Sequence, residues 1–348
     1  MNILITGNMG YIGPTVVQRL RSTYPGAMIY GLDLGYFANC LTNSSILPEC
    51  RLNGQHFCDV RHVPDHMLAD IDAIVHLSAI SNDPMGNAFE EVTLDINYKA
   101  TVKLAGQAKK AGVKAFVFAS SCSMYGYAED GERTETSPLN PLTAYAKSKV
   151  LSEEGLAKLA DSNFTVTSLR FATACGMSER LRLDLVVNDF VAAAVSQKKI
   201  TILSDGTPWR PLIHIKDMAR AIDWAIARKA GKAGAFLAVN AGSKDWNFQV
   251  KALADTVAKV IPGVEISINK NAPPDKRSYR VNFDLFRSLA PDHQPVEDMK
   301  NSIRELKEGL EAISFKDNNF RNSLFMRLKV LEHLMAEGLL STDLAWKF

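Results

Sequence analysis

Short apolar runs alternate with amphipathic segments through the first half of this 348-residue chain. The runs lack the period of two that marks a strand with one solvated face, so we expect strands buried on both faces of a parallel sheet. Right-handed helical crossovers would connect them. We therefore predict an α/β fold with an open, doubly wound parallel sheet. The expected strands are residues 2–6, 27–32, 55–58, 73–77, 115–119 and 165–171, and the expected helices are residues 11–24, 90–111 and 142–159.

The second half of the chain is less regular. Beyond about residue 243 we expect short helices and connections rich in Pro, Asn and Asp, ending in a basic amphipathic helix over 322–340. The earlier elements are a helix over 184–196, a turn-rich loop over 205–211, a helix over 215–229 and a strand over 235–239. The predicted domains are a sheet domain, residues 1–170 with about 212–240, and a smaller mixed C-terminal lobe, residues 171–211 with 241–348.

The bulk composition excludes several classes of protein. Forty basic residues against 38 acidic ones leave no field that would attract nucleic acid or an anionic membrane. No apolar stretch approaches the length of a membrane span, and MNILITG has neither a basic n-region nor a cleavage site. The five cysteines are scattered without a CxxC pair, and the histidines show no metal-ligand spacing. We therefore expect no metal site, no disulfide framework and a location in the reducing cytoplasm.

A glycine-rich loop follows the first expected strand. ITGNMGYIG places Gly7, Gly10 and Gly13 at the mouth of the first helix, where glycines let the backbone approach a pyrophosphate. Asp33 ends the second strand, where a carboxylate accepts the ribose hydroxyls and repels a 2′-phosphate. An ordinary turn and a loop-capping aspartate are the alternatives. The pattern predicts a Rossmann-type site for NAD rather than NADP, in which Asp59 either takes the adenine amino group or caps a helix.

Tyr145 and Lys149 form a YxxxK pair in the expected helix over 142–159. Positions i and i+4 share a helix face, so the ammonium can lie beside the phenol and lower its pKa toward the range of a general acid–base. Taken alone, such a pair is more often surface decoration. A serine-rich loop, FASSCSMYG over 118–126, follows the strand upstream and would bring a hydroxyl to the crevice where doubly wound sheets bind ligands.

With these motifs in consistent order, the chain resembles the extended short-chain dehydrogenases/reductases that act on nucleotide-linked sugars. The resemblance covers nearly the whole chain. It rests on the glycine loop at 7–13, Asp33, CDVRH at 58–62, HLSAIS at 76–81, Asn97, the SS…YG loop at 120–126, Tyr145 with Lys149, LRFATACG at 169–176 and DGTPWRPLIHIKDMARA at 205–221.

The resemblance implies a role for each matched residue. Tyr145 would be the acid–base, Lys149 would lower its pKa and bind the nicotinamide ribose, and Ser121 would hydrogen-bond the reacting oxygen. Asn97 matches a structural or water-organising asparagine of the family. The implied NAD contacts are Gly7, Met9, Gly10, Tyr11, Ile12, Gly13, Asp33, Asp59, Val60, Leu77, Ser78, Ala79, Asn97, Ser120, Tyr145 and Lys149. The implied contacts to a nucleotide-diphosphate sugar are Ser81, Ser121, Cys122, Ser123, Tyr145, Thr173, Arg182, Asn188, Arg210 and Arg277.

Two departures from the family pattern bear on the reaction. Members that eliminate water carry Asp-Glu directly after the catalytic hydroxyl, where this chain has Cys122 and Ser123. Neither side chain makes a good acid–base pair, so a 4,6-dehydratase is disfavoured unless acids from another segment substitute. An acid–base role for Cys122 stays open beside its interpretation as a small buried residue. Thr173 and Cys175 replace the family's usual Asn and aromatic residue, which leaves the sugar undetermined.

Several charged residues carry open alternatives. Arg180 and Arg182 either bind phosphate or are solvated helix charges, and Arg280 is the alternative to Arg277. His214 is expected to be packed rather than catalytic, and the basic stretch 321–329 to be a solvated helix face.

The sequence as a whole predicts an NAD-dependent oxidoreductase that acts at sugar C4, with a 4-epimerase preferred. The alternatives are a one-way 4-dehydrogenase or 4-ketoreductase, a 4,6-dehydratase and, least favoured, a non-catalytic NAD-sensing scaffold. The resemblance further implies a homodimer that pairs the helices bearing Asn97 and Tyr145.

Overall fold

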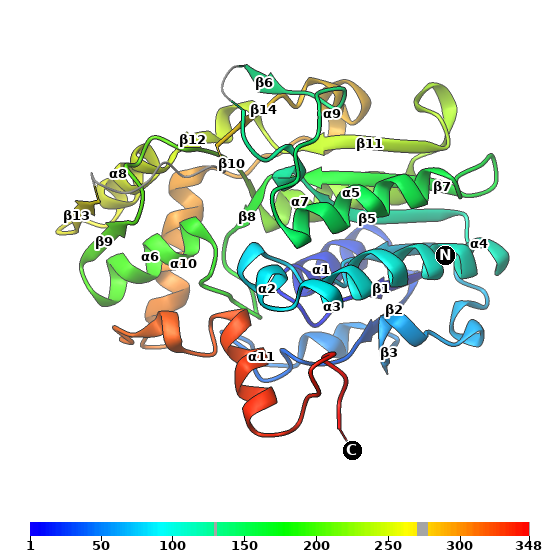
Figure 1. Cartoon of the computed structure of the whole chain (residues 1–348), viewed down its shortest axis with the longest axis horizontal. Coiled ribbons are helices and arrows are strands. Elements are labelled where there is room, and N and C mark those ends of the chain that lie inside the picture. The colour runs from blue at the N-terminus through cyan, green and yellow to red at the C-terminus, as the bar shows by residue number, and fades with distance from the viewer. Residues whose placement is uncertain (129–130, 270–277, 348) are drawn as a thin grey trace.

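A seven-stranded parallel sheet forms the centre of the computed structural model, which describes residues 1–128, 131–269 and 278–347 (Figure 1). Its strand order, β11-β7-β5-β4-β1-β2-β3, reverses direction at β1, as a doubly wound sheet requires. The predicted Rossmann-type fold is confirmed. The strands are β1 (Asn2–Thr6), β2 (Met28–Asp33), β3 (Gly54–Phe57), β4 (Ala73–His76), β5 (Ala115–Ser121), β7 (Thr165–Phe171) and β11 (Phe236–Ala241).

Helices cover both faces of this sheet (Figure 1). Along β1, Ile3 and Ile5 join the apolar cluster under α1 (Gly13–Thr23) and α7 (Ile215–Ala227). Leu4 points to the opposite face and joins the cluster under α4 (Ala100–Lys110) and α5 (Ala144–Ala157). Both faces of the inner strands are therefore buried, which explains their apolar runs in the sequence, whereas the edge strand β3 has no buried residue.

The helix expected over residues 90–111 is instead divided. It begins as α3 (Glu90–Leu94), passes through a π-turn (Asp95–Lys99) and continues as α4; α2 (Asp83–Ala88) precedes it. The hydroxyls of Thr101 and Ser152 both donate to the Asn97 carbonyl, at 2.7 and 2.8 Å. These bonds satisfy the carbonyl that the π-turn draws out of the regular ladder.

The second lobe lies beside the sheet and contains three small sheets (Figure 1). Its strands are β6 (Glu132–Arg133), β8 (Thr173–Cys175), β9 (Lys199–Ile202), β10 (Trp209–His214), β12 (Asn247–Gln249), β13 (Glu265–Ile268) and β14 (Arg280–Val281). Its helices are α6 (Val186–Ser196), α8 (Val250–Val260), α9 (Asp284–Leu289) and α10 (Met299–Ala312). The expectation of short helices beyond residue 243 is wrong for α8 and α10, because each presents a continuous apolar face to the lobe's core.

The C-terminal segment also differs from the single helix expected over 322–340. Its helix is α11 (Arg327–Ala336), and the following chain returns to the edge of the central sheet. There the Trp346 indole donates to the Leu34 carbonyl at 2.8 Å, and Arg61 donates to the Asp343 carbonyl at 2.8 Å. None of the helices in the described ranges is long and apolar enough to cross a membrane.

Candidate active site

A cavity of about 890 Å³ opens at the carboxyl ends of the parallel strands. It extends from the glycine loop to Arg210, and its volume is at the upper end of the usual ~300–1,000 Å³ for small-molecule sites. Of the residues predicted from sequence, those that line it are Gly7, Gly10, Tyr11, Ile12, Asp33, Asp59, Val60, Leu77, Ser78, Ala79, Ser81, Ser120, Ser121, Ser123, Tyr145, Lys149, Thr173, Arg182 and Arg210.

The glycine loop forms one end of the cavity. Gly7 has φ +76°, and a Cβ at this position would lie 2.5 Å from the backbone nitrogen of Ser78, so only glycine fits. The first turn of α1 has no acidic residue and no side-chain cap, which leaves its backbone N–H groups available. Uncapped N–H groups at a helix N-terminus beside a glycine turn fit the pyrophosphate of a dinucleotide.

The two predicted aspartates differ in their surroundings. Asp33 accepts from the backbone N–H groups of Met9 at 3.1 Å and Gly35 at 2.7 Å, and burial raises the pKa of its carboxyl. Asp59 caps a 3₁₀ turn (Val60–His62) and forms an ion pair with Arg61 at 2.6 Å. The capping alternative for Asp59 is therefore realised, although the residue also lines the cavity. Asp33 is the carboxylate that fits a ribose.

Ser121, Tyr145 and Lys149 meet on the cavity wall below β5 and α5. The Ser121 side chain lies near the Tyr145 phenol, close enough to act to lower the pKa of the phenol, and its hydroxyl accepts from the Ser123 backbone N–H at 3.1 Å. The ammonium of Lys149 lies 5.5 Å from the centre of the Tyr145 ring. It donates to the Ala119 carbonyl at 2.7 Å.

Burial dominates the protonation of this group. It raises the pKa of Tyr145 to about 12, against the opposing effect of Ser121. It also lowers the pKa of Lys149 to about 7, so that near neutral pH this side chain is only partly charged. The sequence-based expectation of a lowered tyrosine pKa is wrong for this structure, because desolvation of the phenolate outweighs the lowering effects of Ser121 and Arg182.

A buried network separates the two neighbouring serines. Glu153, one turn beyond Lys149 on α5, accepts from the Ser120 hydroxyl at 2.7 Å and from the Ser168 hydroxyl at 2.9 Å, and it pairs with Arg170 at 2.7 Å. The Ser120 hydroxyl is therefore used in this buried network, although the residue also lines the cavity. Ser121 is the hydroxyl of this loop that remains directed at Tyr145.

Cys122 points away from the cavity. It is 1% exposed, its thiol donates to the Arg170 carbonyl at 3.1 Å, and burial raises the pKa of the thiol well above its ordinary value. A thiol in this environment neither reaches substrate nor titrates in the working range. The structure thus corrects the assignment of Cys122 to the substrate site and disfavours its acid–base role.

We accordingly expect Cys122→Ala to keep catalytic turnover within about twofold of the parent, because an inert buried thiol contributes only packing. Loss of the sulfur should lower the free energy of unfolding by about 1 kcal/mol. Steady-state kinetics and thermal denaturation of the two proteins measure both quantities. A hundredfold loss of turnover with unchanged stability would restore the cysteine to the chemistry.

The side chains of Asn188 and Asn97 form hydrogen bonds within the protein interior. Asn188 is fully buried; its amide donates to the Tyr11 hydroxyl at 3.0 Å and its carbonyl accepts from Gly176 N–H at 3.1 Å. Asn97 accepts from the Ile80 N–H at 2.8 Å and returns a bond to the Ile80 carbonyl. Neither lines the cavity, which corrects their assignment to direct ligand contact; the same holds for Met9 and Gly13.

The predicted arginines separate into three groups. Arg210 lines the cavity and lies close enough to Tyr279 to affect the pKa of its phenol. Arg182 also lines it, paired with Asp184 and donating to Ser81 at 2.7 Å. The guanidinium of Arg180 is buried against Glu49 at 2.9 Å, so neither of its sequence alternatives, phosphate contact or solvated charge, holds. Arg277 lies outside the described residues, and its alternative Arg280 stacks over Trp209 with 5.3 Å between guanidinium carbon and ring centre.

The sequence analysis missed Asp83, Tyr279 and Arg327, all of which line the cavity. The Asp83 carboxylate accepts from the Thr143 hydroxyl at 2.7 Å and acts to raise the pKa of Tyr145. One signal for Asp83 was available, because SNDP follows the fourth strand at its carboxyl end, where ligands bind in such sheets.

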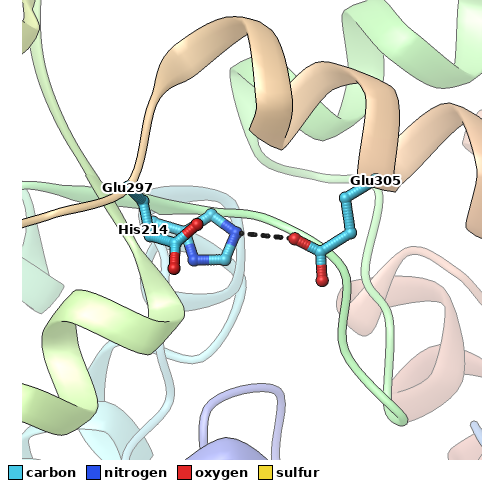
Figure 2. A group of neighbouring side chains, drawn as sticks. All are labelled: His214, Glu297 and Glu305. Atoms are coloured by element: carbon cyan, nitrogen blue, oxygen red, sulfur yellow. Dashed lines mark ion pairs between the residues drawn. The ribbon is translucent and has the colours of Figure 1, made fainter.

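His214, Glu297 and Glu305 form a cluster outside this cavity (Figure 2). The Nδ1 atom of His214 accepts from the Lys216 backbone N–H at 3.1 Å, so a neutral ring carries its proton on Nε2. That Nε2 atom faces Glu305 at 3.5 Å, and the Lys216 ammonium reaches the same carboxylate at 2.9 Å. The carboxylate thus already has a cation and the histidine nitrogen lacks a free lone pair, so the cluster is suited to packing rather than to metal ligation.

Comparison with known proteins gives consistent matches. The model of the NAD dependent epimerase/dehydratase family matches residues 3–242. A Bacillus subtilis (strain 168) protein described as an uncharacterized UDP-glucose epimerase, YtcB, is 30% identical over 231 residues, 64% of this chain and 71% of that protein. A dTDP-glucose 4,6-dehydratase from Streptomyces griseus is 26% identical over 248 residues, 70% of this chain and 74% of that protein.

Among solved structures, TunA, described as an NAD dependent NDP-hexosamine 5,6-dehydratase, superposes with a TM-score of 0.77 at 24% identity. The match covers 91% of this chain and 99% of that one. At this identity the likeness establishes the fold.

Proposed function

Because the chain belongs to the NAD-dependent epimerase/dehydratase family, we propose that it is a nucleotide-sugar 4-epimerase. The observation that carries the proposal is that Ser121, Tyr145 and Lys149 line one cavity, with Ser121 on a loop whose next two residues, Cys122 and Ser123, provide no acid–base pair. This arrangement supports removal of one hydroxyl proton and return of it, without elimination. The one-way 4-dehydrogenase or 4-ketoreductase is the alternative with the same groups.

In this mechanism Tyr145 takes the proton of the sugar C4 hydroxyl as C4 is oxidised and gives it back on reduction. The glycine loop and Asp33 would hold NAD, which when bound would supply the hydride chemistry at C4. Ser121 donates a hydrogen bond to the reacting oxygen, which it can do from its present position next to the phenol. Lys149 supplies positive charge beside the phenolate as it forms.

Substrate recognition would use the polar side chains of the cavity wall. Arg210 lines the cavity, and its guanidinium would suit the diphosphate. Ser81, Ser123 and Thr173 also line the cavity and would supply hydroxyls to the sugar. Inversion at C4 requires the sugar to present either face to the cofactor. Neutral hydroxyls allow the sugar to bind in both orientations more easily than charged side chains that fix one orientation.

Elimination of water is a second candidate, and Asp83 favours it. This carboxylate comes from a segment remote from the 122–123 positions, lines the cavity and acts electrostatically on Tyr145. An acid from another segment is what a dehydratase on this scaffold would need.

Asp83→Asn separates the two functions. For a 4-epimerase we expect turnover within about tenfold of the parent, with the ascending limb of the pH–rate profile moved to lower pH, because removal of a neighbouring negative charge lowers the pKa of Tyr145. For a dehydratase, water loss should fall by about 10²-fold or more. Asp70→Asn, an exposed position where φ is +61° and Asn is well tolerated, is the matched control.

The function itself is tested by incubating the purified protein with UDP-, GDP-, CDP- and dTDP-linked sugars. We expect one nucleotide sugar to change configuration at C4 with no change in mass and no deuterium taken up from D₂O. A product lighter by one water would identify a dehydratase. Stoichiometric accumulation of reduced cofactor would identify a one-way dehydrogenase.

We also propose that two copies pair through the helices bearing Asn97 and Tyr145, and that the protein works in the cytoplasm. All five cysteines are unpaired in the structure, which supports a reducing compartment. Light scattering should give twice the mass of one chain.

A further inference from the structure

Arg327, the first residue of α11, is a buried cation at the cavity. It is 1% exposed and lines the same cavity as the glycine loop. The sequence analysis expected the basic stretch 321–329 to be solvated, and for Arg327 this is wrong because the start of α11 packs into the cleft between the two lobes. Its position lies beyond residues 3–242, to which the family model extends.

The charge of Arg327 is not balanced by a carboxylate. Arg180 pairs with Glu49, Arg182 with Asp184, and Arg321 with Asp189. For Arg327, by contrast, no ion pair forms within the described ranges; its Nη2 donates to the Arg180 carbonyl at 2.7 Å, and its Nη1 has no hydrogen-bond partner there.

Such a group is costly to bury, since an unpaired charge loses its hydration without compensation. Burial accordingly lowers the pKa of Arg327 to about 10, although Cys40 and Asp184 oppose the shift. A buried guanidinium whose Nη1 lacks a hydrogen-bond partner within the described ranges, in the wall of a ligand cavity, suits a ligand anion as the missing partner.

Two neighbours locate that anion along the cofactor site. The guanidinium carbon of Arg327 lies 4.6 Å from the centre of the Phe37 ring, in the loop that follows Asp33. Its charge also acts on the hydroxyl of Tyr11, a residue of the glycine loop. Arg327 therefore lies beside the loop that follows Asp33 and within electrostatic reach of Tyr11.

We propose that Arg327 binds the pyrophosphate of NAD, opposite the N-terminus of α1. The helix N-terminus contributes about half a positive charge and Arg327 a full one, so together they complement the two negative charges of a pyrophosphate. The C-terminal segment thereby becomes part of the dinucleotide site.

The rest of the segment holds this arginine in place. Beyond α11, the Tyr36 hydroxyl donates to the Leu344 carbonyl, and the Trp346 indole donates to the Leu34 carbonyl at 2.8 Å. Both anchors lie on the loop that also carries Phe37. The donor is therefore preorganised by contacts of its own, which limits the entropy lost when the anion binds.

The test compares Arg327→Met with the full-length parent, freed of cofactor, by calorimetric titration with NAD and ADP and by ligand-observed NMR with adenosine. We expect affinity for NAD and ADP to fall by about 10- to 100-fold, the loss expected for a charge-assisted hydrogen bond, while adenosine binds as before. Lys329→Met, at a partly exposed position on the same helix where the ammonium pairs with Glu332, should change neither affinity. These readouts need no turnover.

Unchanged ADP affinity, or an equal loss for ADP and adenosine, would overturn the proposal, the latter because Arg327 would then act through the Phe37 stack alone. If Arg327→Met does not fold, Arg327→Lys decides the question. A loss confined to the phosphate-bearing ligands supports the pyrophosphate contact, and a loss shared by adenosine refutes it.

Discussion

Tyr145→Phe should lower turnover by about 10³- to 10⁴-fold while NAD affinity stays within about twofold. The phenol lines the cavity together with Ser121 and Lys149, so its removal deletes the acid–base and leaves the ring packing intact. The measurement is steady-state kcat with the nucleotide sugar that the parent converts, together with calorimetric titration of NAD.

Tyr127→Phe is the matched control, because this tyrosine is 44% exposed and its loss should leave kcat unchanged. An active Tyr145→Phe protein would contradict the mechanism. A variant that lost NAD binding along with turnover would show that the phenol acts in binding rather than in proton transfer.

Lys149→Met should abolish most activity and yet stabilise the protein. The ammonium is 3% exposed, and burial lowers the pKa of Lys149 from its ordinary 10.5 to about 7. The unfolded chain therefore binds an extra proton between these two pH values, and burying the lysine costs stability throughout the range below them. At pH 7 the difference amounts to about 4 kcal/mol, of which the lost bond to the Ala119 carbonyl offsets about 1–2 kcal/mol.

The sign of the pH dependence follows from the same shift. As pH rises from about 7 to about 10.5, the unfolded state loses its extra proton, so the parent gains stability relative to the variant and the gap between them closes. Chemical denaturation of the cofactor-free proteins at several pH values measures this gap, with exposed Lys147→Met as the control. A variant less stable than the parent at pH 7 would show that Lys149 is buried at no net cost.

The central sheet could be predicted from the sequence for a clear physical reason. β1 and β7 have the bounds expected, because parallel strands covered by helices on both faces are mostly apolar and lack an alternating polar face. The glycine loop and Asp33 could also be predicted from the sequence. The turn at Gly7 excludes a side chain, and Asp33 is the last residue of the next strand, β2.

What the sequence did not reveal depends on tertiary contacts. The π-turn at Asn97 is held by the hydroxyls of Thr101 and Ser152, one of them far along the chain. Cys122 and Asn188 carry functional groups that suited a site, and only packing shows that both point into the interior. The basic stretch 321–329, which includes the start of α11, had an ordinary solvated pattern, so the burial of Arg327 was not visible without the fold.

The account is tested most directly by converting a nucleotide sugar that carries deuterium at C4, in ordinary water, and analysing the product by NMR. For a 4-epimerase we expect the C4 epimer to keep the deuterium at C4, because the same hydride leaves and returns while Tyr145 exchanges only the hydroxyl proton. Loss of the label from C4, or a product short of one water, would contradict it.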